Sequence, residues 1–171
     1  MKLIEALKSV KSLQTKLADL REKITKHAAY MSVETPVYKD QRSTVAGWLQ
    51  SHEDITREIA DLSRRIALTN VTVKVPIKIG ENVLTKTITE WIVRRRLLAG
   101  LDLKAWEALT DRGLKPEALI PSSSGGEPTK VTIVRCFDPE VRDNKVALYK
   151  GEPNDIDVAL ETVNAVTDLL E

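Results

Sequence analysis

Few residues of this chain carry groups that could do chemistry, and their spacing fits neither an active site nor a metal site. The 171 residues include two histidines, His27 and His52, and one cysteine, Cys136. Neither histidine has a carboxylate or a cysteine beside it on its helical face, so we read each as a partly exposed residue near a helix end. We predict no metal, no cofactor and no nucleophile–base set.

Cys136 and two polar runs suggest chemistry that their surroundings do not support. A single cysteine excludes an intrachain disulfide, and with no histidine near it in sequence we expect Cys136 to be a packing residue. The run 122–126, Ser-Ser-Ser-Gly-Gly, lacks the Lys-Ser/Thr and the preceding strand of a phosphate loop. The acidic group Glu152, Asp155 and Asp157 does not have calcium-loop spacing, and we assign it to the first turn of a helix.

Arginine runs are the candidates for contact with a polyanion. Successive helical residues point about 100° apart, so three consecutive arginines cannot all face one phosphate strand. We read them as solvated or salt-bridged, and nucleic acid as possible but not favoured. The candidate residues are Arg64, Arg65, Arg94, Arg95 and Arg96.

Charge is balanced overall but unevenly distributed. The net charge is +1, whereas residues 1–30 carry seven Lys/Arg against three Asp/Glu and residues 138–171 carry three against nine. These segments are either two solvated faces or a basic end that meets an acidic end across a subunit contact. No apolar run reaches the roughly 18 residues of a membrane span, and we expect neither a signal peptide nor a membrane.

The elements that position these residues begin with a heptad repeat over residues 3–31. Leu3, Val10, Leu17, Ile24 and Met31 fall at position a, and position d holds Ala6, Leu13, Leu20 and His27. This pattern predicts a helix over residues 2–29 that packs lengthwise on another helix.

A second helix is predicted from about residue 43 to residue 69. After a break that includes Pro36, residues of the second seam recur at alternating spacings of four and three: Trp48, His52, Ile55, Ile59, Leu62, Ile66 and Thr69. An antiparallel helical hairpin with the two seams facing is the simplest assembly.

The periodicity then changes from helix to strand. Alternating apolar residues at 71–79, a turn at 80–82 and a return strand at 83–87 predict a β-hairpin, with Pro76 marking an edge strand. Thr87 and Glu90 form a capping box for a third helix, with Gly113 at its C-terminal end.

The last third of the chain is predicted to hold a linker, a strand and a helix. Residues 114–130 contain Pro116, Pro121 and Pro128 and read as a flexible linker. Residues 130–137 alternate as a third strand for the hairpin, which Asp138-Pro139 ends. Residues 141–150 fit either strand or helix, and a final acidic helix begins at Pro153.

The fold class expected from these elements is mainly α (α+β), with a long antiparallel helical hairpin, a small antiparallel sheet and two further helices. The expected parts are a coiled-coil-like hairpin (1–70), a β-hairpin with helix three (71–113), the linker (114–130), and a strand with the acidic helix (131–171) that packs with 71–113.

Four segments carry a resemblance to a known family. They are 1–7 (MKLIEAL), 66–70 (IALTN), 84–88 (LTKTI) before the arginine-rich helix, and 156–160 (IDVAL). With these, the chain resembles the septicolysin-like small coiled-coil proteins of bacteria and phages, a family of unknown function. The likeness extends over roughly two-thirds of the chain, and the linker and residues 138–154 depart from it. The family name implies a lysin, but the sequence has no membrane-insertion segment, and no functional residues carry over.

The function we expect from the sequence is structural and non-enzymatic. Heptad seams and an edge strand are surfaces through which subunits join, so we predict a homo-oligomer, such as a phage virion component of the head or tail, with other structural proteins as partners. The location would be the cytoplasm of the producing cell or the virion. The alternative is a module that binds nucleic acid or an acidic protein through its arginine-rich helices. The contact candidates are Leu3, Val10, Leu17, Ile24, Ile55, Ile59, Leu62, Ile66, Val73, Val75 and Ile77.

Overall fold

The protein is mainly helical with a small antiparallel sheet, as predicted. The structure is a computed structural model, and it describes residues 1–115, 119–120, 129–130 and 132–171. In chain order the elements are α1 (Leu3–His27), α2 (Gln41–Thr72), β1 (Lys74–Ile79), β2 (Asn82–Thr87), α3 (Ile88–Val93), the π-helix η1 (Arg94–Leu98), α4 (Ala99–Glu107), β3 (Leu119–Ile120), β4 (Thr129–Lys130) and α5 (Pro139–Val166).

The chain divides into two compact units. The first comprises Met1–Val75, Thr87–Thr89 and Leu160–Glu171, and the second comprises Pro76–Lys86 and Glu90–Ala159. The predicted division at residues 70, 113 and 130 differs from this one, because elements distant in sequence share a unit.

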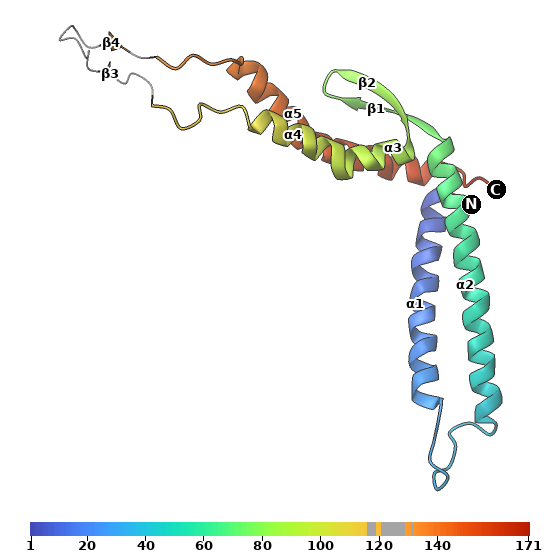
Figure 1. Cartoon of the computed structure of the whole chain (residues 1–171). Coiled ribbons are helices and arrows are strands. Elements are labelled where there is room, and N and C mark those ends of the chain that lie inside the picture. The colour runs from blue at the N-terminus through green and yellow to red at the C-terminus, as the bar shows by residue number, and fades with distance from the viewer. Residues whose placement is uncertain (116–118, 121–128, 131) are drawn as a thin grey trace. The chain divides into compact units, whose positions relative to one another are not determined.

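An antiparallel hairpin of α1 and α2 forms most of the first unit (Figure 1). Every seam residue predicted within α1 is buried or half-buried, from Leu3 to His27, while Met31 lies beyond the helix and is exposed. The seam of α2 is buried or half-buried over its whole predicted length, and Asp40 caps this helix by accepting a hydrogen bond from the Ser43 N–H (2.9 Å). The seam residues of α1 and α2 therefore face each other within the chain.

Both chain termini are attached to the open end of this hairpin. The Leu3 N–H donates to the Thr167 carbonyl and the Leu169 N–H to the Met1 carbonyl, each at 2.9 Å, which makes a short antiparallel bridge between Lys2 and Asp168. The Leu170 N–H donates to the Thr69 hydroxyl (3.0 Å), and Thr69 is fully buried. The C-terminal segment thus covers the same end of the hairpin that holds buried Leu3.

The β-hairpin of β1 and β2 follows α2 directly. β1 begins at Lys74 rather than at Val71, because α2 continues to Thr72, and Val75, Ile77 and Ile79 are its buried residues. A two-residue turn joins the strands, and Gly80 there has φ +59°. This left-handed conformation at the first central residue matches a type II′ turn, which favours glycine.

The predicted third helix corresponds to one continuous helical stretch that runs from α3 through η1 to α4. The Ala99 N–H bonds the Arg94 carbonyl, five residues earlier, so the helix widens by one residue there. The predicted end at Gly113 is wrong, because α4 stops at Glu107 and Gly113 lies in a separate turn with φ +70°.

The prediction of a third strand over residues 130–137 is also wrong. Residues 132–138 are irregular, and Val134 and Cys136 are exposed; Val131 lies outside the described residues. A strand needs a neighbour to pair with its backbone, and no described strand lies along these residues. Cys136 is therefore not the half-buried packing residue that we expected.

The last helix starts fourteen residues earlier than predicted, at Pro139 instead of Pro153. Asp138 is the cap, because its carboxylate accepts from the N–H groups of Glu140 (2.8 Å) and Val141 (3.3 Å). Proline at the first helical position needs no N–H partner, so Asp138-Pro139 starts a helix rather than ending a strand.

The segment predicted as a linker is described only in part. Leu119 and Ile120 pair antiparallel with Lys130 and Thr129, so these four residues form two short strands, contrary to the expectation that residues 114–130 lack regular structure. Residues 116–118 and 121–128 of the predicted linker lie outside the described part of the chain.

Replacing Gly80 with alanine should lower the free energy of unfolding by about 1–2 kcal/mol, since an L-residue at positive φ is strained. A Cβ at this position would also approach the Leu148 side chain to 3.0 Å. Gly47→Ala in α2 is the matched control, because its Cβ would meet nothing within 4 Å; it should stabilise by about 0.5–1 kcal/mol. Chemical denaturation measures both, and equal effects of the two changes would contradict the turn assignment.

The Lys2–Asp168 ion pair (2.9 Å) should be visible in the acid titration of Asp168. The hydrogen bond from the Lys2 ammonium lowers the pKa of the Asp168 carboxyl below its ordinary value. The contribution of this pair to stability is therefore present above the ordinary pKa of about 4 and is lost as pH falls through the lowered pKa. Measured by NMR, Lys2→Met should return the pKa of Asp168 towards its ordinary value, and Lys8→Met should leave it unchanged.

Candidate functional site

The most strongly coupled polar cluster of the described residues is centred on Arg94, in the second unit. Its guanidinium forms a bidentate pair with Glu152, with Nε 2.6 Å from Oε1 and Nη2 2.7 Å from Oε2. Nη1 bonds the Asp102 carboxylate (2.5 Å), and the Tyr149 ring centroid lies 5.5 Å from the guanidinium carbon. Three side chains from two helices therefore converge on one cation.

Local backbone geometry explains how Arg94 reaches these partners. It is the first residue of η1, and the wider turn there sets its direction towards α5, where Glu152 is only 2% exposed. Pro153 follows Glu152 inside α5, at a position where proline removes a helical hydrogen bond. The ion pair stabilises α5 where its own backbone is weakest.

The chemistry available at this cluster is electrostatic. The hydrogen bonds that Arg94 donates to the Glu152 carboxylate, opposed by burial, raise the pKa of the Arg94 guanidinium still further above its ordinary value. Arg94 is therefore a permanent cation that cannot transfer a proton, and the buried carboxylate of Glu152 is fully engaged with it. We conclude that the cluster fixes α5 to the α3–η1–α4 helix.

The acidic group of the sequence analysis belongs to this contact. Glu152 pairs with Arg94 and Asp157 pairs with Arg95, while Asp155 is exposed. Assigning the three acids to a helix first turn was wrong, because they lie in the interior of α5. Among the described residues no group of three or more His, Cys, Asp or Glu side chains could hold a metal ion.

Most of the polyanion candidates are committed to partners within the chain. Arg64 pairs with Asp61 (2.9 Å), and the Arg65 Nε donates to the Leu170 carbonyl (3.1 Å). Arg94 and Arg95 are paired as above, and Arg96 is exposed, as is Arg64 in its pair with Asp61. The reading of these arginines as salt-bridged or solvated agrees with these contacts.

The two histidines lie on the hairpin seam in different settings. His27 is the last residue of α1, and its ring lies 5.2 Å from that of Tyr38 and 5.7 Å from that of Trp48, centroid to centroid. Gln41 is buried beside it and donates to the His27 carbonyl (2.8 Å). His52 is half-buried well inside α2, so its expected place near a helix end was wrong.

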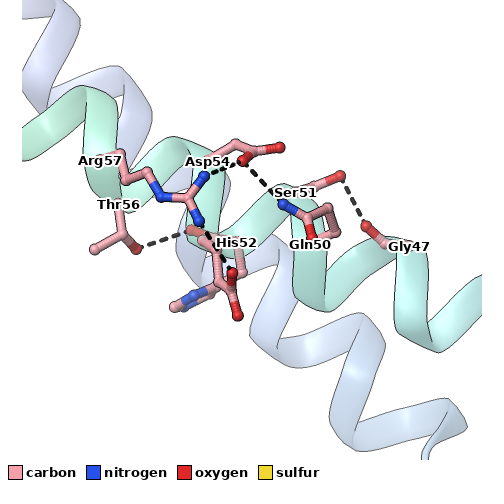
Figure 2. A network of polar contacts seen from close by, with 8 residues as sticks. Gly47, Gln50, Ser51, His52, Asp54, Thr56 and Arg57 are labelled. Carbon is pink, nitrogen blue, oxygen red and sulfur yellow. Dashed lines mark hydrogen bonds and ion pairs between the residues drawn. The ribbon is translucent and has the colours of Figure 1, made fainter.

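Polar groups on the outside of α2 around His52 bond only along the helix (Figure 2). Arg57 contacts Glu53 (3.3 Å) and Asp54 (3.0 Å), Gln50 donates to Asp54 (3.0 Å), and the Thr56 hydroxyl donates to the His52 carbonyl (2.8 Å). All of these pairs are three or four residues apart, so they support the helix and do not converge on a ligand position.

The hollows of the described surface are small and open. One of roughly 290 Å³ lies at the turn end of the hairpin and is lined by His27, Ala28, Ala29, Tyr30, Gln41, Arg42 and Val45. The adjoining loop exposes Met31, Val33 and Val37. This end offers apolar contact area but no acid–base pair.

The predicted contact residues fall into two groups. Four are buried within the chain and have no surface to offer a partner: Leu3, Leu62, Val75 and Ile77. The others are half-buried: Val10, Leu17, Ile24, Ile55, Ile59, Ile66 and Val73. The hairpin seam is thus accessible mainly along its middle.

Comparison with known proteins shows the fold alone. The structure is similar to the crystal structure of a functionally unknown conserved protein from Corynebacterium diphtheriae, with a TM-score of 0.58, 20% sequence identity and 99% of each chain covered. No family model matches the sequence, and no curated protein matches it significantly. Among the described residues, every helix is too short or too polar to span a lipid bilayer.

Arg94→Ala should lower the free energy of unfolding by about 3–5 kcal/mol, because it leaves the buried carboxylate of Glu152 without a partner. Arg64→Ala is the control, since the Arg64–Asp61 pair is exposed and should contribute about 1 kcal/mol or less. Urea unfolding with circular dichroism detection measures both. Similar losses in the two variants would contradict the role assigned to the Arg94 cluster.

Proposed function

We propose that this protein is a non-enzymatic structural protein that self-associates through its helical hairpin. The observation that carries the proposal is the half-open seam of α1 and α2. From Leu17 and Leu20 to Ile24 on α1, and from Val45 to Ile59 on α2, every apolar seam residue is half-buried and none is fully buried. A contact between only two helices leaves the flanks of the seam open, whereas four helices enclose it.

Charge favours a second copy as the partner. Residues 8–26 of α1 carry six basic and two acidic side chains, and residues 53–61 of α2 carry four acidic and one basic. In the described part of the chain no ion pair joins α1 to α2. The α1 helix of one copy would therefore meet a complementary charge on α2 of another, as expected for two hairpins that form a four-helix bundle.

The assembly we propose is a phage virion, with this protein as an accessory component of the head or tail. A chain with long, partly open seams suits a role in which many copies and other structural proteins pack together. Its place would then be the cytoplasm of the producing cell and, after assembly, the particle. The resemblance to the septicolysin-like proteins also remains a prediction.

Mass spectrometry of purified particles from the host strain tests the virion proposal, and absence of the chain from every particle would contradict it.

A second candidate, binding to nucleic acid or an acidic protein, rests on the lysine face of α1 rather than on the arginines. Lys8, Lys11, Lys16, Lys23 and Lys26 are exposed, and the described part of the chain gives them no ion-pair partner. Binding to duplex DNA that weakens steeply with salt would favour this function over self-association.

Sedimentation of the purified chain should give a native mass that is a multiple of 19.1 kDa at micromolar concentration. Ile59→Asn should reduce this mass towards that of the monomer, because it places an amide in the half-buried seam. Ala60→Asn is the matched control on the neighbouring exposed position and should leave the mass unchanged. Circular dichroism checks that both variants stay helical, and a wild-type monomer at tens of micromolar would refute self-association.

A further inference from the structure

A stripe on the exposed side of the α3–η1–α4 helix has an unusual pattern for a solvated surface. Its residues recur three or four positions apart, with an acid at one end, a base at the other and three aliphatic residues between: Glu90, Val93, Leu97, Leu101 and Lys104. All five are exposed, and the fractions for the three aliphatic residues are 42%, 54% and 52%. We refer to these five residues as the self-pairing stripe.

The opposite side of the same helix already contributes to the core. Trp91 and Ala99 have no exposed surface, and Arg94 points to α5. The helix is thus apolar on two sides, while an ordinary surface helix has one apolar face and one polar face. Leu98, 40% exposed, adds to the apolar surface beside the stripe. Exposed aliphatic residues contiguous along a helix mark a contact surface.

The spacing of the stripe is symmetric about Leu97. Glu90 and Lys104 each lie seven residues from it, and Val93 and Leu101 each lie four residues from it. If two such helices lie antiparallel with Leu97 at the centre, Glu90 faces Lys104 of the other copy and Val93 faces Leu101 of the other copy. Each contact then occurs twice, which is the property of a two-fold interface.

We propose that a second copy of this chain docks on the self-pairing stripe, antiparallel and about a two-fold axis at Leu97. The two ends of the stripe carry opposite charge, so antiparallel pairing joins unlike charges and parallel pairing joins like ones. The pairing depends on the negative charge of Glu90, and this side chain can keep its contacts within its own chain. The surface is one helix wide, smaller than a standard interface, so the pair forms reversibly with rising concentration.

This inference rests on the proposed function, since it supplies one contact of the proposed assembly, but it uses a different surface from the hairpin seam. Two separate self-pairing surfaces on one chain would extend an assembly beyond a dimer.

Charge reversal tests the pairing without depending on the fold of any single variant. In Glu90→Lys the stripe is basic at both ends, and in Lys104→Glu it is acidic at both ends. Each variant alone should associate about tenfold or more weakly at the stripe than the wild type, because like charges then face each other twice. An equimolar mixture should recover the association, because the two stripes are then complementary. We would carry out sedimentation in the Ile59→Asn background, which removes the hairpin contact.

The outcomes separate this inference from the proposed function. Weakened single variants and a recovered mixture support the pairing. A mixture no more associated than its components, or single variants as associated as the parent, overturns the pairing while leaving hairpin association to its own test. A wild-type chain that stays monomeric overturns both.

Cross-linking checks the register. In a Cys136→Ser background, Leu97→Cys should form an intermolecular disulfide under mild oxidation, because the two positions meet on the axis. Val93→Cys should not, because its two copies would be about 12 Å apart along the helix. Equal cross-linking of both would overturn the antiparallel register.

Discussion

Attachment of both chain ends to the open end of the α1–α2 hairpin is the constraint on which the first unit depends. The bridge between Lys2 and Asp168 and the bond from Leu170 to the buried Thr69 hydroxyl join three segments that are far apart in sequence. Buried apolar residues gather in these segments, among them Leu3, Ala6 and Leu169. Two helices alone enclose little volume, so the core forms where the C-terminal segment adds a third layer. Away from that end the seam stays half-open.

The second unit depends on a different kind of contact. Arg94 and Glu152 join two helices through a bidentate ion pair whose carboxylate is buried, and loss of either partner from such a pair is destabilising. The π-turn that aims Arg94 at α5 also widens the helix by one residue, and Leu97 and Leu98 both lie on its exposed side. The π-turn thus accompanies both the attachment of α5 through Arg94 and the exposed apolar surface at Leu97 and Leu98. π-turns inserted in helices are often found at functional positions.

Each of the two units carries one of the proposed contact surfaces. The hairpin has an apolar seam flanked by a basic helix and a partly acidic one, and the second unit has a short stripe with opposite charges at its ends. Surfaces of this kind give affinity through apolar area and orientation through charge. The ion pairs of Arg94 with Glu152 and of Lys2 with Asp168 join parts of the same chain and lie outside these surfaces.

Local pattern in the sequence determined the α1 and α2 helices, the β1–β2 hairpin and the mainly helical fold class. A heptad spacing specifies which residues face inward whatever the partner, and glycine at the left-handed position of a two-residue turn specifies a hairpin. The start of α5 at Asp138-Pro139 was also readable as a cap followed by proline, and we misread it because the preceding alternation suggested a strand. The tertiary structure alone decided which charges meet. Arg94 and Glu152 are 58 residues apart, and their pairing depends on a π-turn and on the packing of α5, neither of which has a signature in local spacing. The same holds for Leu97, whose exposure could not be deduced because the sequence shows a residue's character but not which of two apolar faces a neighbouring helix will cover.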